Sequence, residues 1–72
     1  MMTLDRIPGG TRVKLKSLEA CPHGLARRLM EMGLVPGEEV EVVSNIRGPV
    51  IIRVRGIVLA LGRGIARRIL VE

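Results

Sequence analysis

Apolar residues recur with helical spacing from residue 25 to residue 33. At about 100° per residue they fall on one arc, which is the pattern of a helix with one buried face. The predicted buried face comprises Leu25, Leu29 and Met32, widened by Ala26 and Met30. The predicted exposed face comprises Arg27, Arg28 and Glu31. Gly33 is expected to end the helix in a left-handed conformation, with Leu34 placed to contact Leu29.

The pattern changes from helical to alternating after Pro36-Gly37. This pair suits the two corners of a tight turn, and the alternating residues that follow open a strand. Five short strands are predicted, over residues 11–17, 38–44, 50–55, 57–61 and 69–71. The run 57–61 is apolar at every position, which is typical of a central strand covered on both faces. Residues 3–7 are expected to form a single turn capped by Thr3.

Short strands joined by tight turns favour an antiparallel sheet that curls into a small barrel, because curling hides the edges of the sheet. Arg55-Gly56 is expected to supply the tightest of these turns. The sequence therefore predicts a mainly β fold: a small antiparallel β-barrel of about five short strands with one inserted α-helix. We expect a single domain over residues 1–72.

The composition restricts which residue types can form the core and which cellular compartment is expected. With 47% apolar residues and no aromatic one, the core must consist of Val, Ile, Leu, Met and Ala. The single cysteine rules out an internal disulfide. No apolar run approaches the roughly 18 residues of a membrane span, and the N-terminus lacks the apolar segment of a signal peptide. We therefore expect a cytoplasmic protein with no direct insertion into a membrane.

The net charge of +5 is unevenly distributed and allows an acidic partner. Acidic residues cluster at positions 38, 39 and 41, whereas residues 42–71 contain six arginines and no acid. Arg12, Lys14 and Lys16 alternate along the first long strand and would present one basic row to a nucleic acid backbone. The chain has no aromatic side chain on which a base could stack, so only electrostatic, salt-dependent binding would remain. No specific nucleic acid partner is predicted.

Catalytic and metal-binding residues are few. Cys21 and His23 are the only pair with metal-ligand character, and two donors make neither a structural nor a catalytic zinc site without Glu19, another loop or a second copy. The one histidine and the two serines do not supply a nucleophile, base and orienting group. Gly62-Arg63-Gly64 is too short for a phosphate-binding loop. We predict no enzyme, no cofactor and no metal.

The run from Leu25 to Gly37, a helix ending in Met-Gly-Leu before Pro-Gly, resembles the signature of the FeoA family, ferrous iron transport protein A. Residues 52–56, 59–61 and 69–71 are similar to the hairpin and the final strand of that family. Gly62 and Gly64 depart from it, since the family commonly has polar or acidic residues there. The resemblance implies an SH3-like β-barrel that acts as a cytoplasmic accessory to the ferrous iron transporter FeoB.

The resemblance also guides the choice of a partner surface, for which the cytoplasmic GTPase region of FeoB is the expected partner. The candidate partner-binding residues are Arg27, Arg28, Met30 and Glu31 on the helix, Arg53 and Arg55 on the hairpin, and Arg67 and Arg68 near the end of the chain. Arg27 and Glu31 also have the spacing of an ordinary surface ion pair, and Met30 that of a core residue. A homodimer through a sheet edge or the helix face is possible.

Two alternatives remain open at this stage. One is a counterpart of the C-terminal SH3-like domain of diphtheria-toxin-repressor-type metal regulators, although no DNA-binding helix-turn-helix precedes it in this chain. The other is a small basic RNA-binding barrel. Because phosphate contacts weaken steeply with salt, the salt dependence of binding separates the RNA-binding barrel from a protein-binding domain.

Overall fold

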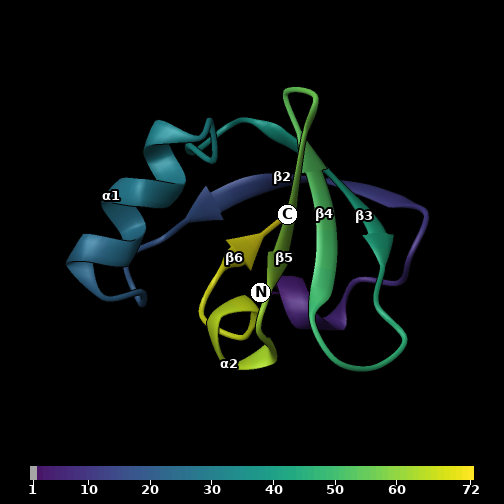
Figure 1. The fold of residues 1–72 in the computed structure, drawn as a ribbon. Coiled ribbons are helices and arrows are strands. Elements are labelled where there is room, and N and C mark those ends of the chain that lie inside the picture. Colours follow the sequence, from purple (N-terminus) through teal and green to yellow (C-terminus); the bar gives the residue numbers. More distant parts are fainter. Residues whose placement is uncertain (1) are drawn as a thin grey trace.

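A computed structural model describes residues 2–72 and shows a strongly curled antiparallel sheet with one long helix beside it (Figure 1). The sheet order is β1-β6-β2-β3-β4-β5. In chain order the elements are β1 (Met2–Thr3), η1 (Leu4–Arg6), β2 (Thr11–Ser17), α1 (His23–Glu31), β3 (Glu39–Ser44), β4 (Val50–Val54), β5 (Ile57–Leu61), α2 (Arg63–Ala66) and β6 (Leu70–Val71). The predicted mainly β fold with one inserted helix is confirmed.

The sixth strand is at the N-terminus, where only a turn was predicted. Met2–Thr3 pairs antiparallel with β6, and the expected turn follows as the 3-10 helix η1. The predicted cap is wrong, because the Thr3 hydroxyl donates to the Asp5 carboxylate and caps no backbone N–H. The turn is fixed by packing instead, with Leu4 fully buried.

The core is formed where alternating strand residues point inward. Successive side chains of a strand point to opposite faces, so every second position of β3 and β4 enters the barrel. The fully buried side chains are Leu4, Leu15, Leu34, Ile52, Ile69, Val40, Val42, Val50, Val54 and Val71. Each such side chain contributes about 1.5–3 kcal/mol relative to exposure, so the aliphatic core predicted from composition carries the fold.

Helix α1 begins at His23, two residues before the predicted start, because Pro22 precedes the first helical hydrogen bond and is tolerated there. Its C-terminus is a Schellman motif: Leu34 N–H donates to the Leu29 carbonyl at 3.0 Å, and Gly33 N–H to Met30 at 3.0 Å. Gly33 has φ 102°, as the sequence predicted. Met32 is 39% exposed, so its predicted burial is wrong, and Leu29 is the one buried side chain of α1.

The Pro36-Gly37 turn is also confirmed. Glu38 N–H donates to the Val35 carbonyl at 3.0 Å, and Gly37 has φ 91°. Gly37 N–H donates in addition to the Leu15 carbonyl of β2 at 2.8 Å, which ties the turn to the sheet. The segment that leaves α1 is therefore held against the barrel at a fixed position.

Strand β5 contradicts the prediction of a central, hidden strand. It is the last strand of the sheet order, so only β4 lies beside it. Ile57 is 44% exposed and Val58 56% exposed, and only Leu61 is buried. The tight turn before it is as predicted, with positive φ at both Arg55 and Gly56.

Among the described residues, no helix is long and apolar enough to cross a membrane.

Candidate functional site

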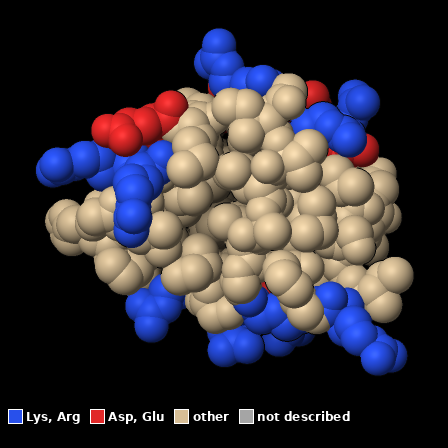
Figure 2. All heavy atoms as spheres, in the orientation of Figure 1, with Lys and Arg blue, Asp and Glu red and all other residues tan. Residues whose placement is uncertain are grey.

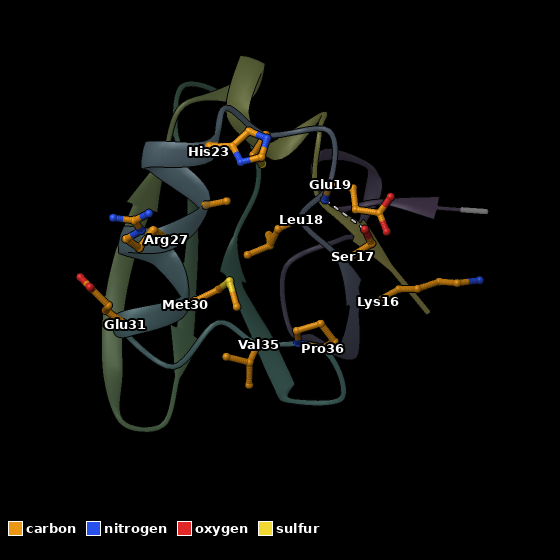
Figure 3. A pocket seen from close by; sticks show the side chains of 12 residues that line it. Lys16, Ser17, Leu18, Glu19, His23, Arg27, Met30, Glu31, Val35 and Pro36 are labelled. Atoms are coloured by element: carbon orange, nitrogen blue, oxygen red, sulfur yellow. Dashed lines mark hydrogen bonds between the residues drawn. The ribbon is translucent and has the colours of Figure 1, made fainter.

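A groove of about 720 Å³ lies between α1, the end of β2 and the connector that joins them (Figure 3). Figure 3 shows Met30 and Leu18 pointing toward one another across it. Its other lining residues are Lys16, Ser17, Glu19, Cys21, His23, Ala26, Arg27, Glu31, Val35 and Pro36. The groove therefore has an apolar floor and a charged rim, which suits a partner segment with an apolar anchor.

The local fold explains why the floor stays open. Ala26 and Met30 are one turn apart and share the helix face that looks toward Leu18. Ala26 is small, so the helix face is hollowed there, and Met30 remains 47% exposed instead of filling the space. A methionine with three rotatable bonds adapts to the shape of a partner. Met30 is thus an exposed apolar residue of the groove and not a core residue.

A second hollow, of about 380 Å³, lies at the C-terminal end of α1. It is lined by Met30, Glu31, Met32, Gly33, Val35, Arg55 and Ile57. Met30, Glu31 and Val35 line both the groove and the hollow, so the two form one continuous surface around the end of the helix. We call the residues of the groove and of the hollow together the α1 surface.

The structure brings together some of the predicted partner-binding residues. Arg27, Met30 and Glu31 line the groove, Arg55 lines the hollow, and Arg28 is exposed on α1. Within residues 2–72 the ion pairs are Arg53–Glu41, Arg55–Glu38 and Arg67–Asp5, so Arg27 and Glu31 do not pair with each other. The charged groups of the helix remain free to meet a partner.

The other three predicted residues lie elsewhere and make contacts within the chain. Arg53 donates to Glu41 at 2.7 Å on the outer face of the sheet. Arg67 Nε lies 4.0 Å from Asp5 Oδ2, and Arg68 donates to the Ala20 carbonyl at 3.2 Å. The α1 surface therefore contains four of the eight candidates, and Arg28 is exposed on the same helix without lining the groove or the hollow.

The basic row on β2 is not a continuous basic stripe. In the sheet register Arg12 lies opposite Glu41 and Lys14 opposite Glu39. Opposite charges side by side on neighbouring strands attract one another and reduce the positive potential of the row. Figure 2 shows acidic and basic atoms mixed near the upper edge of the molecule, whereas the charged atoms at the lower edge are mainly basic.

Cys21 and His23 differ in environment although they are two residues apart. Cys21 is 5% exposed, and its burial raises the pKa of the thiol, an effect that the nearby Arg68 guanidinium partly opposes. His23 is exposed at one end of the groove. Nowhere in the described part of the chain do three His, Cys, Asp or Glu side chains come together. A buried thiol in its protonated form is a poor metal ligand.

Several groove residues were missed by sequence reasoning. Leu18 and Val35 lie in connectors on either side of α1, where no periodicity marks an apolar residue as part of a surface. Ile57 was assigned to a hidden strand and instead lines the hollow. The one available signal was the position of Pro36, whose turn brings Val35 back beside the helix.

A family model and a named relative each match most of this chain. The family model of the FeoA domain matches residues 2–72. A Methanocaldococcus jannaschii protein named "Putative Fe(2+) transport protein A" is 42% identical over 64 residues, which cover 88% of this chain and 76% of that protein.

Solved structures give the same result for the fold. The crystal structure of Stenotrophomonas maltophilia FeoA complexed with zinc, described as a prokaryotic SH3 domain protein, superposes with a TM-score of 0.88 at 32% identity and covers 100% of this chain and 91% of that one. The crystal structure of T. acidophilum IdeR superposes with a TM-score of 0.86 at 18% identity and covers 99% of this chain and 33% of that one, which shows the shared fold alone. The family model, the archaeal relative and the SH3-like architecture together show that this chain belongs to the FeoA family.

Proposed function

We propose that this protein is a non-enzymatic, cytoplasmic accessory of ferrous iron uptake that binds the cytoplasmic part of a FeoB-type transporter. Membership of the FeoA family and the name of the archaeal relative support a role in ferrous iron transport. The ion is the cargo of the transporter in this proposal. The protein itself acts through its surface.

The observation that carries the proposal is the α1 surface. Met30 is 47% exposed at the centre of a groove with an apolar floor, and Arg27 and Glu31 flank it without pairing. Interfaces are typically built this way, with an apolar anchor inside a charged rim in which arginine is frequent. The partner segment that fits would place one apolar side chain beside Met30 and polar groups along the rim.

Regulation follows if the transporter changes the shape of the segment that this surface binds. A protein that binds two conformations of its partner equally shifts nothing, whereas a tenfold preference for one conformation shifts the equilibrium tenfold. The fixed Pro36-Gly37 turn and the Schellman motif hold the groove in one shape, which makes such a preference achievable. The domain then favours the transporter conformation whose cytoplasmic segment matches the groove.

Isothermal titration against the cytoplasmic GTPase region of FeoB from the same source, at physiological salt and with each guanine nucleotide, tests the proposal. We expect saturable binding that Met30→Asp weakens at least about tenfold, since the substitution places an unpaired charge in the apolar floor. Ile46→Asp is the matched control, because Ile46 is 86% exposed in the β3–β4 loop. If no binding is seen in any nucleotide state, the proposed partner is wrong. If Met30→Asp and Ile46→Asp lose the same affinity, the proposed binding site is wrong.

Charge reversals then separate the two clusters of candidate arginines. Arg27→Glu should weaken binding because Arg27 lines the groove, and Arg67→Glu should leave binding within about threefold because Arg67 lies beside Asp5 and outside the α1 surface. The opposite order would move the interface to the α2 side of the molecule. A parallel titration with structured RNA at two salt concentrations tests the RNA-binding alternative, for which the interleaved charges of β2 and β3 give little support.

A further inference from the structure

Strand β5 presents an unused hydrogen-bonding edge. It follows a two-residue turn, and its register with β4 runs from Val54↔Ile57 to Val50↔Leu61. In such a hairpin the residues that flank the turn exchange backbone hydrogen bonds, and the exchange recurs at every second pair. Ile57, Leu59 and Leu61 therefore bond to β4. The N–H and C=O groups of Val58 and Ala60 point away from β4, and within residues 2–72 no backbone hydrogen bond to another segment uses them.

This edge lacks the features that normally protect a sheet edge. The five residues of β5 include no charge and no proline, whereas proteins usually place Lys, Pro or a very short strand at such a position. The other edge strand, β1, has only two residues. β5 runs down the centre of the view in Figure 1, and Figure 2 shows that the centre of this face is largely free of charged atoms, which gather around its rim.

We propose that β5 pairs with β5 of a second copy of this chain in an antiparallel, two-fold symmetric dimer. With Leu59 on the two-fold axis, Val58 of each copy lies opposite Ala60 of the other, and each of these pairs exchanges both backbone hydrogen bonds. In this register the backbone N–H and C=O groups of Val58 and Ala60 that point away from β4 are hydrogen-bonded in both copies. It is isologous, so it closes on itself and leaves no free β5 edge for further growth.

The charges near β5 are compatible with this register. Along the outer face Arg53 of one copy is three strand spacings, about 14 Å, from β4 of the other copy, which exceeds the Debye length of about 10 Å at 0.1 M salt. Arg53 is in addition paired with Glu41 at 2.7 Å. Arg55 comes opposite Arg63 of the second copy, but Arg55 lies 3.7 Å from Glu38, and Arg63 donates to Asn45 in its own chain.

A second copy suits the edge better than a charged partner does. The strand has no charge by which to select an acidic or basic segment, and Val58 and Ala60 on its outer face offer only apolar contacts, which an identical strand can match. In this dimer β5 becomes a central strand, because it then has a neighbouring strand on each side, and Val58 of each copy lies beside Ala60 of the other on the outer face. Two five-residue strands bury little area, so the association is weak and depends on concentration.

Sedimentation equilibrium from about 5 µM to about 1 mM tests the dimer, a range that covers weak contacts of this size. We expect a reversible monomer–dimer equilibrium that persists at high salt. Val58→Lys should weaken it at least about tenfold, since it places a charge at the pairing edge. Ala60→Pro should do the same by removing an outward N–H that β4 does not use. Ile46→Lys, on the exposed β3–β4 loop, is the matched control and should change nothing.

Disulfide trapping tests the register. In a Cys21→Ser background, Leu59→Cys should form a symmetric intermolecular disulfide, because paired residues on the axis have Cα atoms about 4.5 Å apart. Val58→Cys is more exposed but should link poorly, because it lies opposite Ala60 of the second copy and not opposite itself. A monomer throughout the concentration range, a dimer indifferent to Val58→Lys, or open-ended association would each overturn the proposal.

These outcomes are independent of the transporter. The self-association experiment contains only this chain, and Met30→Asp, which tests the transporter contact, should leave the dimer unchanged. A dimer without transporter binding would refute the proposed function alone. Transporter binding by a strict monomer would refute the dimer alone.

Discussion

The two helices mark regions that use their polar and apolar groups in opposite ways. At the α2 end, by which we mean Asp5, Ile7, Asn45, Arg63 and Arg67, polar groups are bonded within the chain. Asn45 donates to the Asp5 carbonyl at 2.9 Å and to the Ile7 carbonyl at 2.7 Å, and accepts from Arg63 at 2.7 Å. One amide thus connects the end of β3 with η1 and α2.

The α1 surface shows the reverse. Met30 and Met32 are 47% and 39% exposed, and the side chains of Arg27 and of the neighbouring Arg28 make no hydrogen bond or ion pair with the described part of the chain. Only Leu29 of this helix is buried. The α2 end therefore stabilises the fold, whereas the α1 surface leaves apolar and charged groups exposed, as the proposed partner contact requires.

Among the substitutions considered, Asn45→Ala at the α2 end is expected to reduce the free energy of unfolding most. The substitution removes three hydrogen bonds and leaves the half-buried carbonyls of Asp5 and Ile7 without their donor, so we expect a loss of about 2–3 kcal/mol in the free energy of unfolding. Urea unfolding followed by far-UV circular dichroism measures it, since the chain has no aromatic residue for fluorescence. Arg47→Ala, in the same loop and exposed, should change stability by less than about 0.5 kcal/mol.

We expect the folded Asn45→Ala protein to bind its partner with unchanged affinity, because the Asn45 amide lies outside the α1 surface. Equal stability losses in Asn45→Ala and Arg47→Ala would show that the Asn45 contacts do not hold the α2 end together. A large loss of partner affinity at a temperature where the variant is fully folded would show that the two regions are coupled.

Two glycines of the α1 region provide the next largest effect. Gly33→Ala forces a φ of 102° on a residue with a Cβ, which would also lie 2.8 Å from Cδ of Arg55, a flexible side chain that can move aside. We expect a cost of about 1–2 kcal/mol, mostly from the backbone. Gly24→Ala, near the start of the same helix, adds a Cβ that meets nothing within 4 Å and should stabilise by about 0.5–1 kcal/mol.

Thermal and urea unfolding of the two glycine variants measure this difference on one element. A stabilising Gly33→Ala would show that the left-handed C-cap is not required to end α1. The displacement of Arg55 adds a functional prediction, because Arg55 lines the hollow at the end of the helix. Gly33→Ala should therefore weaken partner binding modestly, whereas Gly24→Ala should not.

Local signals explain which features the sequence revealed. The helix stop at Gly33-Leu34, the Pro36-Gly37 turn and the Arg55-Gly56 turn depend on the conformational preferences of one or two residues, and all three are present. The alternation of β3 and β4 likewise predicted their buried positions. These features can be predicted from the local sequence, because they do not depend on residues that are distant in the chain.

The features that were missed depend on what lies beside a segment in space. Apolar residues in β5 indicated burial, but the sheet order leaves that strand at an edge. Asn45 was assigned to a loop, and its partners are 38 and 40 residues away in the chain. The groove arises where connectors meet a helix face, so Leu18 and Val35 carried no periodic signal. The α1 residues were predicted from the sequence to bind a partner, and that stays a prediction, whereas the hollow shape beside them had no signal in the sequence.

The smallest expected effect concerns the outer face of the sheet, which lies outside both regions. Arg53 and Glu41 approach to 2.7 Å, yet their side chains are 47% and 31% exposed, so solvent and salt screen the pair. A double-mutant cycle of Arg53→Ala and Glu41→Ala should give a coupling free energy of about 0.2–0.5 kcal/mol that vanishes in 1 M salt. Because Arg53 is already paired on a face away from the groove, Arg53→Ala should also leave partner affinity within about twofold. A larger loss would extend the interface from the α1 surface across β4, and it would show that an arginine with a partner in its own chain can still serve another protein.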